Sequence, residues 1–219
     1  MKTVVCIFAH PDDEAFGPGG TIAKLARKNR VYIISATKGE AGKEKGRRGS
    51  KNLHKIRADE LLASAKILGV QKVFFLGFKD GELSNNLYHK LARRLERILV
   101  RLKPHALLTY EPRGISGHLD HVAVSMVVSY VFERLPFVKK LMQLCIPENR
   151  ARMMHKRYFI HFPPGYKKSE IDLVVNVRDT WDTKVRAMLQ HQSQIHDIRR
   201  ILKMIAKFPK KEYFLTQFK

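Results

Sequence analysis

Short apolar runs alternate with amphipathic segments along most of this chain, and this alternation constrains its fold more than any other feature. Four runs have the composition of β-strands and cover residues 3–9, 31–37, 72–78 and 106–112. Each is followed by a segment with helical spacing of its apolar residues, over residues 20–29, 54–69, 86–102 and 121–135. Strands that are apolar throughout and alternate with helices are typical of parallel sheets. The sequence therefore predicts an α/β fold with a mostly parallel sheet and helices on both faces.

The length of the chain, 219 residues, suits one α/β domain, which we expect to span residues 1–219. After Pro136 the regular alternation of apolar and amphipathic segments ends. A predicted strand over residues 171–177 and a helix from about Asp179 follow. We predict that residues 136–219 form a C-terminal elaboration on the same sheet. No signal peptide or membrane-spanning run is present, and Cys6 and Cys145 lack metal-binding spacing. We expect a soluble, cytoplasmic protein with reduced cysteines, and the oligomeric state stays open.

Histidine and aspartate residues gather after the first and the fourth predicted strand. The first cluster, in "HPDDE", contains His10, Asp12 and Asp13, and the second, in "GHLDH", contains His118, Asp120 and His121. Because parallel strands place their carboxyl ends at one edge of the sheet, we expect the two clusters to meet. Two histidines and one carboxylate with a free position are ligands typical of catalytic Zn²⁺, which activates water. One residue is left over in each cluster: Asp12 to accept a proton, and His118 to donate one or to stabilise an oxyanion.

The glycines beside the first cluster suggest a second interpretation, a loop that binds nucleotide phosphates. In "GPGGTIA", however, Ile22 stands where the dinucleotide fingerprint needs a glycine or alanine, and Pro18 removes one backbone N–H. The carboxylates just upstream would also repel a pyrophosphate. The remaining alternative is structural, since an aspartate-rich turn often only caps a helix. Two such clusters on equivalent loops favour an active site instead.

At these residues the chain resembles the LmbE-like, or PIG-L-type, family of zinc-dependent de-N-acetylases, which act on N-acetylglucosaminyl conjugates. "AHPDDE" and "GHLDH" match its two signature blocks, and "ATKGEAG", "RADELLASAKILGV", "LGFKDGEL" and "KVRAMLQHQSQ" extend the similarity over most of the chain. The resemblance implies a Rossmann-like fold. It also implies one Zn²⁺ ion on His10, Asp13 and His121, a general base at Asp12, an acid or oxyanion stabiliser at His118, and Asp120 orienting His118.

The resemblance further implies three substrate contacts. Arg57 and Asp80 would reach the sugar hydroxyls, and His191 would close the pocket. Each has a local alternative: Arg57 can pair with Glu60 on a helix, Asp80 can form a turn, and His191 can cap a helix. Family members that act on phosphatidylinositol conjugates carry an N-terminal membrane segment, which this sequence does not show, so a lipid-linked substrate is less expected.

The chain is strongly basic, with 42 Lys and Arg against 20 Asp and Glu and a formal net charge of +22. Such a charge attracts phosphates, acidic glycans and anionic membrane surfaces. We predict a hydrolase that removes the N-acetyl group from a small N-acetylglucosaminyl-type conjugate. The charge indicates that this substrate, or the surface that presents it, is anionic, the alternative being that the basic surface serves only solubility. The alternative is a non-catalytic basic module that binds glycans or nucleic acid, although no nucleic-acid motif is present. The basic stretch over residues 38–55 is expected to be mobile and to border the pocket.

Overall fold

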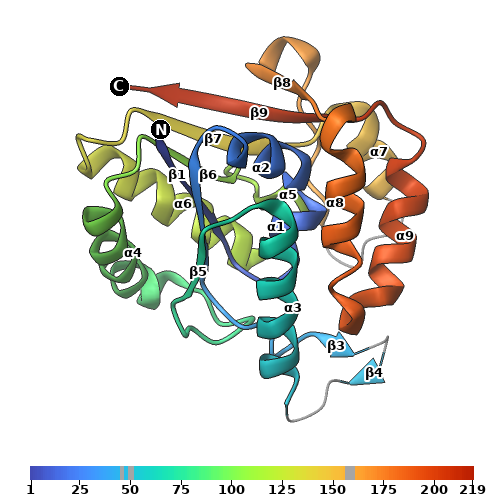
Figure 1. Cartoon of the computed structure of the whole chain (residues 1–219), viewed down its shortest axis with the longest axis horizontal. Coiled ribbons are helices and arrows are strands. Elements are labelled where there is room, and N and C mark those ends of the chain that lie inside the picture. Colours follow the sequence, from blue (N-terminus) through green and yellow to red (C-terminus); the bar gives the residue numbers. More distant parts are fainter. Residues whose placement is uncertain (45–46, 49–51, 156–160) are drawn as a thin grey trace.

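The computed structural model describes residues 1–44, 47–48, 52–155 and 161–219 (Figure 1). One sheet contains β1 (Thr3–Phe8), β2 (Arg30–Ser35), β5 (Lys72–Phe75), β6 (Ala106–Tyr110), β7 (Lys140–Cys145), β8 (Leu173–Asn176) and β9 (Lys211–Phe218). A separate antiparallel pair, β3 (Lys43–Glu44) and β4 (Arg47–Arg48), lies in the basic stretch after β2. The predicted mobility of this stretch concerns residues 38–55, of which residues 45–46 and 49–51 lie outside the described residues.

The strands of the main sheet follow the order β5-β2-β1-β6-β7-β9-β8. The strands from β5 to β7 pair in parallel, whereas β9 runs antiparallel to both β7 and β8. All residues of the interior strand β1 are buried, which explains why its sequence is almost entirely apolar. The chain leaves β1 toward β2 on one side and later returns to β6 on the other, so a crevice opens at the carboxyl ends of β1 and β6. The predicted α/β fold is confirmed.

Helices cover both faces of this sheet (Figure 1). One layer contains α2 (Gly19–Ala26), α3 (Leu53–Leu68) and α8 (Trp181–Met188), and the opposite layer contains α4 (Tyr88–Leu102) and α6 (Leu119–Arg134). In α4, Leu91, Leu95 and Leu99 recur every four residues and are buried, while Arg93 and Arg97 between them are exposed. The remaining helices, α1 (Asp13–Phe16), α5 (Gly114–Gly117), α7 (Glu148–His155) and α9 (Ile195–Ile205), lie around the carboxyl edge of the sheet.

The C-terminal strand ties the edge of the sheet to the first helices. Glu212 in β9 accepts hydrogen bonds from the backbone N–H groups of Gly20 (3.0 Å) and Thr21 (2.7 Å) in the first turn of α2. Lys184 of α8 forms a buried ion pair with the same carboxylate at 2.7 Å. These contacts satisfy helix-terminal donors that would otherwise be buried without partners. None of the described helices combines the length and the apolar character needed to cross a membrane.

Candidate metal centre and active site

The loop after β1 brings two of the predicted ligands together. Pro11 follows His10 directly, and α1 begins at Asp13, so the chain reverses within three residues. The His10 backbone N–H donates to Asp13 Oδ2 at 2.8 Å, which fixes the carboxylate beside the imidazole. Asp12 adopts a φ of 109°, a conformation that a non-glycine residue rarely takes. Such backbone strain is typical of functional sites, and here it directs two consecutive aspartates to different places.

The second cluster lies at the start of α6, beyond β6. His118 is the N-cap residue of α6, and its Nδ1 atom accepts a hydrogen bond from the Asp120 backbone N–H at 3.2 Å. His121 follows in the first helical turn. Its ring stacks on the Tyr110 ring with centroids 4.3 Å apart. Helical spacing therefore sends His118 and His121 toward the loop after β1, with ring centroids 5.0 Å apart.

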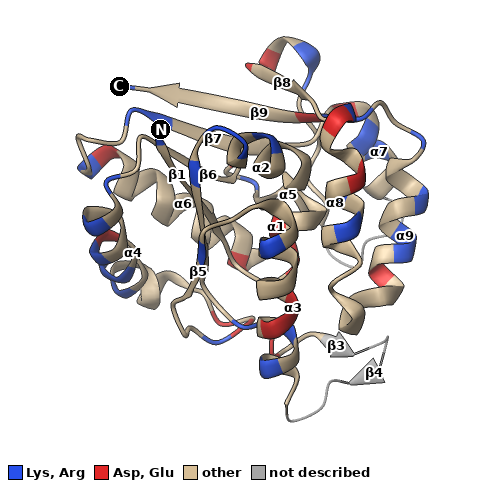
Figure 2. Cartoon of the chain, in the orientation of Figure 1, with Lys and Arg blue, Asp and Glu red and all other residues tan. Residues whose placement is uncertain are grey.

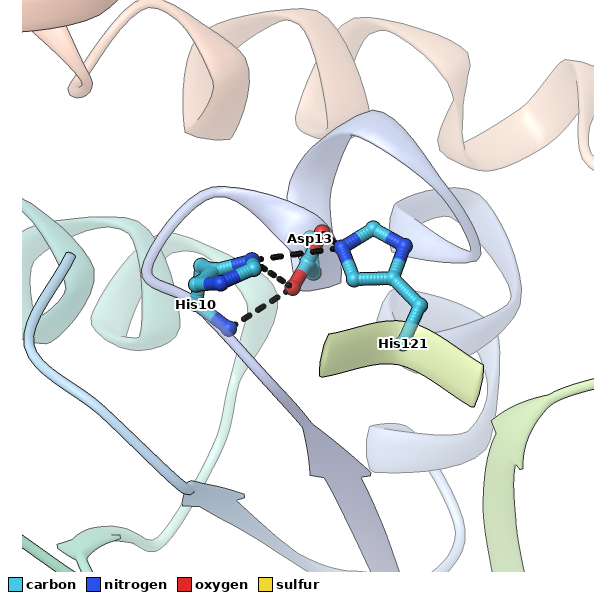
Figure 3. A group of neighbouring side chains, drawn as sticks. All are labelled: His10, Asp13 and His121. Carbon is cyan, nitrogen blue, oxygen red and sulfur yellow. Dashed lines mark hydrogen bonds and ion pairs between the residues drawn. The ribbon is translucent and has the colours of Figure 1, made fainter. Parts of the chain in front are cut away.

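Three of these side chains converge closely enough to share one ion (Figure 3). The ligand atoms of His10, Asp13 and His121 all lie within 4.8 Å of one another. His10 Nδ1 is 3.2 Å from His121 Nε2 and 3.6 Å from Asp13 Oδ2, and His121 Nε2 is 3.3 Å from Asp13 Oδ1. Two imidazole nitrogens and a carboxylate are a donor set that Zn²⁺ accepts, and it leaves positions for water and substrate.

A second group, His10 with His118 and Asp120, also meets the distance criterion for a metal site. Hydrogen bonds decide between the two groups. His10 Nε2 faces Asp80 Oδ1 at 2.9 Å and Asp120 Oδ2 at 3.1 Å, and His121 Nδ1 faces the Gly114 carbonyl at 3.2 Å. Because these oxygens accept, the facing ring nitrogens carry the hydrogens, which leaves His10 Nδ1 and His121 Nε2, 3.2 Å apart and beside Asp13, to face a shared ion. Metal-binding histidines typically have such outer partners, so the group of His10, Asp13 and His121 fits a metal better.

The ionisation of these side chains follows from their surroundings. Burial lowers the pKa of His10, but hydrogen bonds to Asp120 and Asp80 outweigh it and raise this pKa to about 10. Burial favours a protonated Asp13, yet the charges of His121 and His10 hold the pKa of that carboxyl below its usual range. Burial lowers the pKa of His121 to about 4. Asp13 is therefore ionised and His121 neutral near pH 7, the forms in which they bind metals.

Asp12 has a different environment from Asp13. Its Oδ2 atom accepts a hydrogen bond from Arg57 at 2.9 Å, and its side chain is 15% exposed. Burial raises the pKa of Asp12 to about 7, although the Arg57 charge opposes this shift. A carboxylate with a pKa near the working pH is suited to accept and return a proton.

His118 lies close to the loop after β1: the centroids of its ring and of the His10 ring are 4.8 Å apart. Because its Nδ1 atom accepts the Asp120 N–H, its Nε2 atom carries the hydrogen in the neutral ring. Burial lowers the pKa of His118, which favours that neutral form. The side chain can thus donate a hydrogen bond from Nε2.

The structure places the side chains of Asp120 and His191 beside other partners than the expected ones. Asp120 bonds to His118 through its backbone N–H, and its carboxylate is engaged elsewhere. The carboxylate accepts from His10 Nε2 and from the backbone N–H groups of Gly81 (2.8 Å) and Leu83 (3.1 Å), so it orients a predicted ligand instead. His191 is fully buried and is absent from the lining of the cavity, because its Nε2 atom lies 2.8 Å from Glu14 Oε1.

The other two expected substrate contacts do line the cavity. Arg57, on α3, donates to the Gly39 carbonyl at 2.7 Å as well as to Asp12, whereas its expected partner Glu60 binds Ser193 instead. Asp80 faces His10 and accepts the Ala41 N–H at 3.0 Å. Both side chains are already engaged with residues of the site.

A cavity of about 1240 Å³ extends from the predicted ligands toward α7, α9 and the start of β9. Its far part is lined by apolar side chains and by cations: Met153, Met154, Ile201, Met204, Phe208, Arg150, Arg152, Lys203, Lys207 and Lys211. Sequence reasoning missed this part, because α9 and β9 were not predicted. The amphipathic spacing of "IHDIRRILKMI" is the signal from which this helix could have been predicted.

With this geometry established, comparison with known proteins places the chain in a family. The model described as "PIG-L: GlcNAc-PI de-N-acetylase" matches residues 5–132, more than half of the chain. The chain belongs to the PIG-L family. The matched region contains both histidine and aspartate clusters, so the predicted resemblance is confirmed.

Three curated relatives of this PIG-L protein are named as deacetylases. It is 32% identical to diacetylchitobiose deacetylase of Thermococcus kodakarensis, over 89% of this chain and 70% of the relative. It is 30% identical to 1D-myo-inositol 2-acetamido-2-deoxy-alpha-D-glucopyranoside deacetylase of Mycobacterium sp. strain JLS, over 89% and 75%. It is 28% identical to a probable N-acetyl-alpha-D-glucosaminyl L-malate deacetylase 2 of Bacillus cereus, over 88% and 84%.

Solved structures agree with this placement. N,N'-diacetylchitobiose deacetylase from Pyrococcus horikoshii superposes with a TM-score of 0.71 at 25% identity, covering 99% of this chain and 84% of that one. The 4-carboxy-2-hydroxymuconate hydratase GalB from Pseudomonas putida reaches 0.74 at 16% identity, covering 100% and 97%, and shares the fold alone. The named relatives confirm the predicted enzyme class, a deacetylase, over the non-catalytic alternative.

Proposed function

We propose that this PIG-L protein hydrolyses the acetamide of a small N-acetylglucosaminyl-type conjugate, releasing acetate and a free amine. The observation that carries the proposal is the arrangement of the site. The metal-ligand group of His10, Asp13 and His121 opens into the same cavity as Asp12 and His118. Amide hydrolysis needs an activated water, a proton acceptor and a donor for the developing oxyanion, and these side chains supply them.

The metal ion that we propose is Zn²⁺, one per chain, held by His10, Asp13 and His121. Their imidazole nitrogens and carboxylate oxygen match its preferences, and His10 would release its Nδ1 proton when the ion binds. When bound, such an ion polarises the acetyl carbonyl and makes a water molecule more acidic. Asp80 and Asp120 would keep His10 in the required tautomer through its Nε2–H.

The chain's own residues divide the remaining chemistry. Asp12 accepts a proton from the attacking water, whose oxygen forms a bond to the acetyl carbon. His118 donates a hydrogen bond from Nε2 to the oxygen that becomes negative. The C–N bond then breaks, and the proton held by Asp12 passes to the leaving amine. Arg57 keeps the Asp12 carboxylate in place through its 2.9 Å hydrogen bond.

We also propose that the rest of the substrate carries a negative charge. The support is the set of cations along the far part of the cavity, which includes Arg152, Lys203 and Lys207. The positive potential of these cations would attract an anionic group on the aglycone.

We further propose a cytoplasmic setting for the reaction. Both cysteines are unpaired and buried, which supports a reducing compartment.

An amine-release assay tests the proposed function. The purified protein, loaded with Zn²⁺, is incubated with N-acetylglucosaminyl-inositol, N-acetylglucosaminyl-malate, diacetylchitobiose and N-acetylglucosamine 1-phosphate, and fluorescamine detects new amines. We expect release from at least one of them, one equivalent of acetate per amine, and loss of both activity and bound metal in His121→Ala. No release from any N-acetylated sugar by metal-loaded protein would contradict the proposal.

A further inference from the structure

A buried carboxylate beside the site takes no part in the proposed chemistry. Glu111 follows β6 directly and is 2% exposed. Its Oε1 atom accepts the backbone N–H of Ile115 at 2.7 Å. Its Oε2 atom accepts the backbone N–H of Arg113 at 2.7 Å and the hydroxyl of Tyr166 at 2.6 Å. Both oxygens are thus committed to one short turn and to one side chain from the C-terminal region.

The turn held by Glu111 has an unfavourable backbone. Gly114 has a φ of 68°, and Ile115 has φ 64° and ψ −60°. For a β-branched residue this conformation is a genuine outlier and is energetically costly. A Cβ atom at Gly114 would lie 3.0 Å from the His121 Cβ and 2.9 Å from the Val122 backbone nitrogen. The turn therefore packs directly against the helix that carries His121, and it needs hydrogen bonds to keep its shape.

The shape of this turn sets the direction of the Gly114 carbonyl group. The turn directs the Gly114 carbonyl at His121 Nδ1, 3.2 Å away, and this contact leaves Nε2 free to face Asp13. We propose that Glu111 is a positioning residue for the metal site: it holds the strained turn so that Gly114 orients His121 as a ligand. The inference rests on the proposed function, because it assumes that His121 binds the metal.

Tyr166 extends this support to the C-terminal part of the chain. Arg113 lies over the Tyr166 ring, 4.5 Å from its centroid, and donates to the Pro164 carbonyl at 2.8 Å. The Tyr166 backbone N–H in turn donates to the Ile146 carbonyl, just after β7, and its carbonyl accepts the Glu148 N–H, both at 2.9 Å. A residue far from the signature clusters thus steadies one of the metal ligands through Glu111.

The test measures metal affinity rather than turnover. The variant Glu111→Gln keeps the size of the side chain but places an NH₂ group against a backbone N–H donor. Tyr166→Phe removes one of the three hydrogen bonds and is less disruptive. Glu60→Gln is the matched control, since Glu60 also accepts a backbone N–H and a hydroxyl, both from Ser193 (2.6 and 2.7 Å). Affinity for Zn²⁺ is read by competition with a chromophoric chelator, and circular dichroism of the metal-free forms checks the fold.

We expect Glu111→Gln to weaken Zn²⁺ binding by about 10- to 100-fold, the usual effect of losing an outer partner of a ligand. Tyr166→Phe should weaken it less, and Glu60→Gln should leave it unchanged. The visible spectrum of the Co²⁺ form should shift in Glu111→Gln and not in the control. If Glu111→Gln misfolds, Tyr166→Phe decides the question. Unchanged affinity in a folded Glu111 or Tyr166 variant, or equal loss in Glu60→Gln, overturns the inference. If the wild-type chain binds no Zn²⁺, the proposed metal site fails first and this inference with it.

Discussion

Two adjacent aspartates in this site have opposite ionisation preferences, although both are largely buried. Asp13 lies beside two histidines and accepts hydrogen bonds from Tyr110 and from the His10 backbone, which stabilises its anion. Asp12 points away through its positive φ, and burial outweighs the charge of Arg57. One carboxylate is therefore suited to bind a metal and the other to carry a proton. The difference arises from backbone direction, not from residue type.

The variant Asp12→Asn tests this division of roles. We expect it to retain one metal ion per chain and a wild-type fold, while kcat falls by about 10²- to 10⁴-fold, the usual worth of general acid–base help. Amine release and elemental analysis on the same preparation provide the measurement, with His10→Ala as the variant expected to lose the metal. If Asp12→Asn lost metal in proportion to activity, Asp12 would be a ligand rather than the base.

At the scale of elements, a buried histidine joins the segment after α8 to the first helix. His191 Nε2 lies 2.8 Å from Glu14 Oε1, and Ser64 of α3 donates to the same oxygen at 2.5 Å. Burial alone would lower the pKa of His191, but the Glu14 charge and hydrogen bond outweigh it and raise this pKa. Because the folded pKa lies above the unfolded one, the stabilisation is complete below about pH 6.5 and is lost as pH rises through the folded pKa.

His191→Gln should therefore lower the free energy of unfolding more at pH 6 than at pH 9. We expect a loss of about 1.5–3 kcal/mol at pH 6, the range for hydrogen bonds to charged groups. Urea denaturation at both pH values measures it, and His196→Gln, which changes an exposed histidine on α9, is the control. An equal loss at the two pH values would mean that His191 is neutral in the folded protein.

The approach of α2 to the segment after β8 depends on a glycine. A Cβ atom at Gly20 would lie 2.6 Å from the Val177 Cβ, which is closer than real contacts allow. Helix propensity alone would make Gly20→Ala stabilising by about 1 kcal/mol. We expect destabilisation of about 1–3 kcal/mol instead, because the helix must move away from β8. The double variant Gly20→Ala with Val177→Ala should recover part of that loss. Urea denaturation of the wild type, the two single variants and the double variant measures the coupling free energy between the two positions. Additive effects would show that the two residues do not compete for space.

Much of the fold follows from the sequence, and the exceptions have physical causes. β1 and β6 were predictable because strands buried on both faces are apolar throughout. β7 carries Gln143, which is buried yet polar, and β9 (KEYFLTQF) has an apolar run of only three residues between polar pairs, so neither matched that pattern. The two clusters of the site were predictable from their places after strands. The contact between Asp120 and His10 was not, because it depends on how the loop after β5 folds over α6.

At the scale of the whole molecule, the charge of +22 is unevenly placed. In Figure 2, Lys and Arg positions are frequent along α4 and also occur on α7 and α9. Only the second group borders the cavity. Lys203 of α9 and Lys207, which follows the end of α9, line its far part. The field of the first group is screened over about 8 Å at physiological salt, so it should affect substrate capture little. The two groups can therefore be separated by experiment.

Reversing charge at one site or the other tests the proposed anionic substrate. Lys203→Glu with Lys207→Glu changes the cavity, and Lys90→Glu with Arg101→Glu makes the same change in net charge on α4, where both side chains are exposed. For N-acetylglucosamine 1-phosphate, we expect kcat/KM to fall by about tenfold or more in the cavity variant and to change little in the α4 variant. A neutral methyl N-acetylglucosaminide should respond little to either. For the wild-type protein, raising the salt should lower kcat/KM only for the phosphate ester, because screening weakens attraction between charges. If both double variants behaved alike, or if salt affected both substrates equally, the cations of α9 would serve solubility rather than recognition.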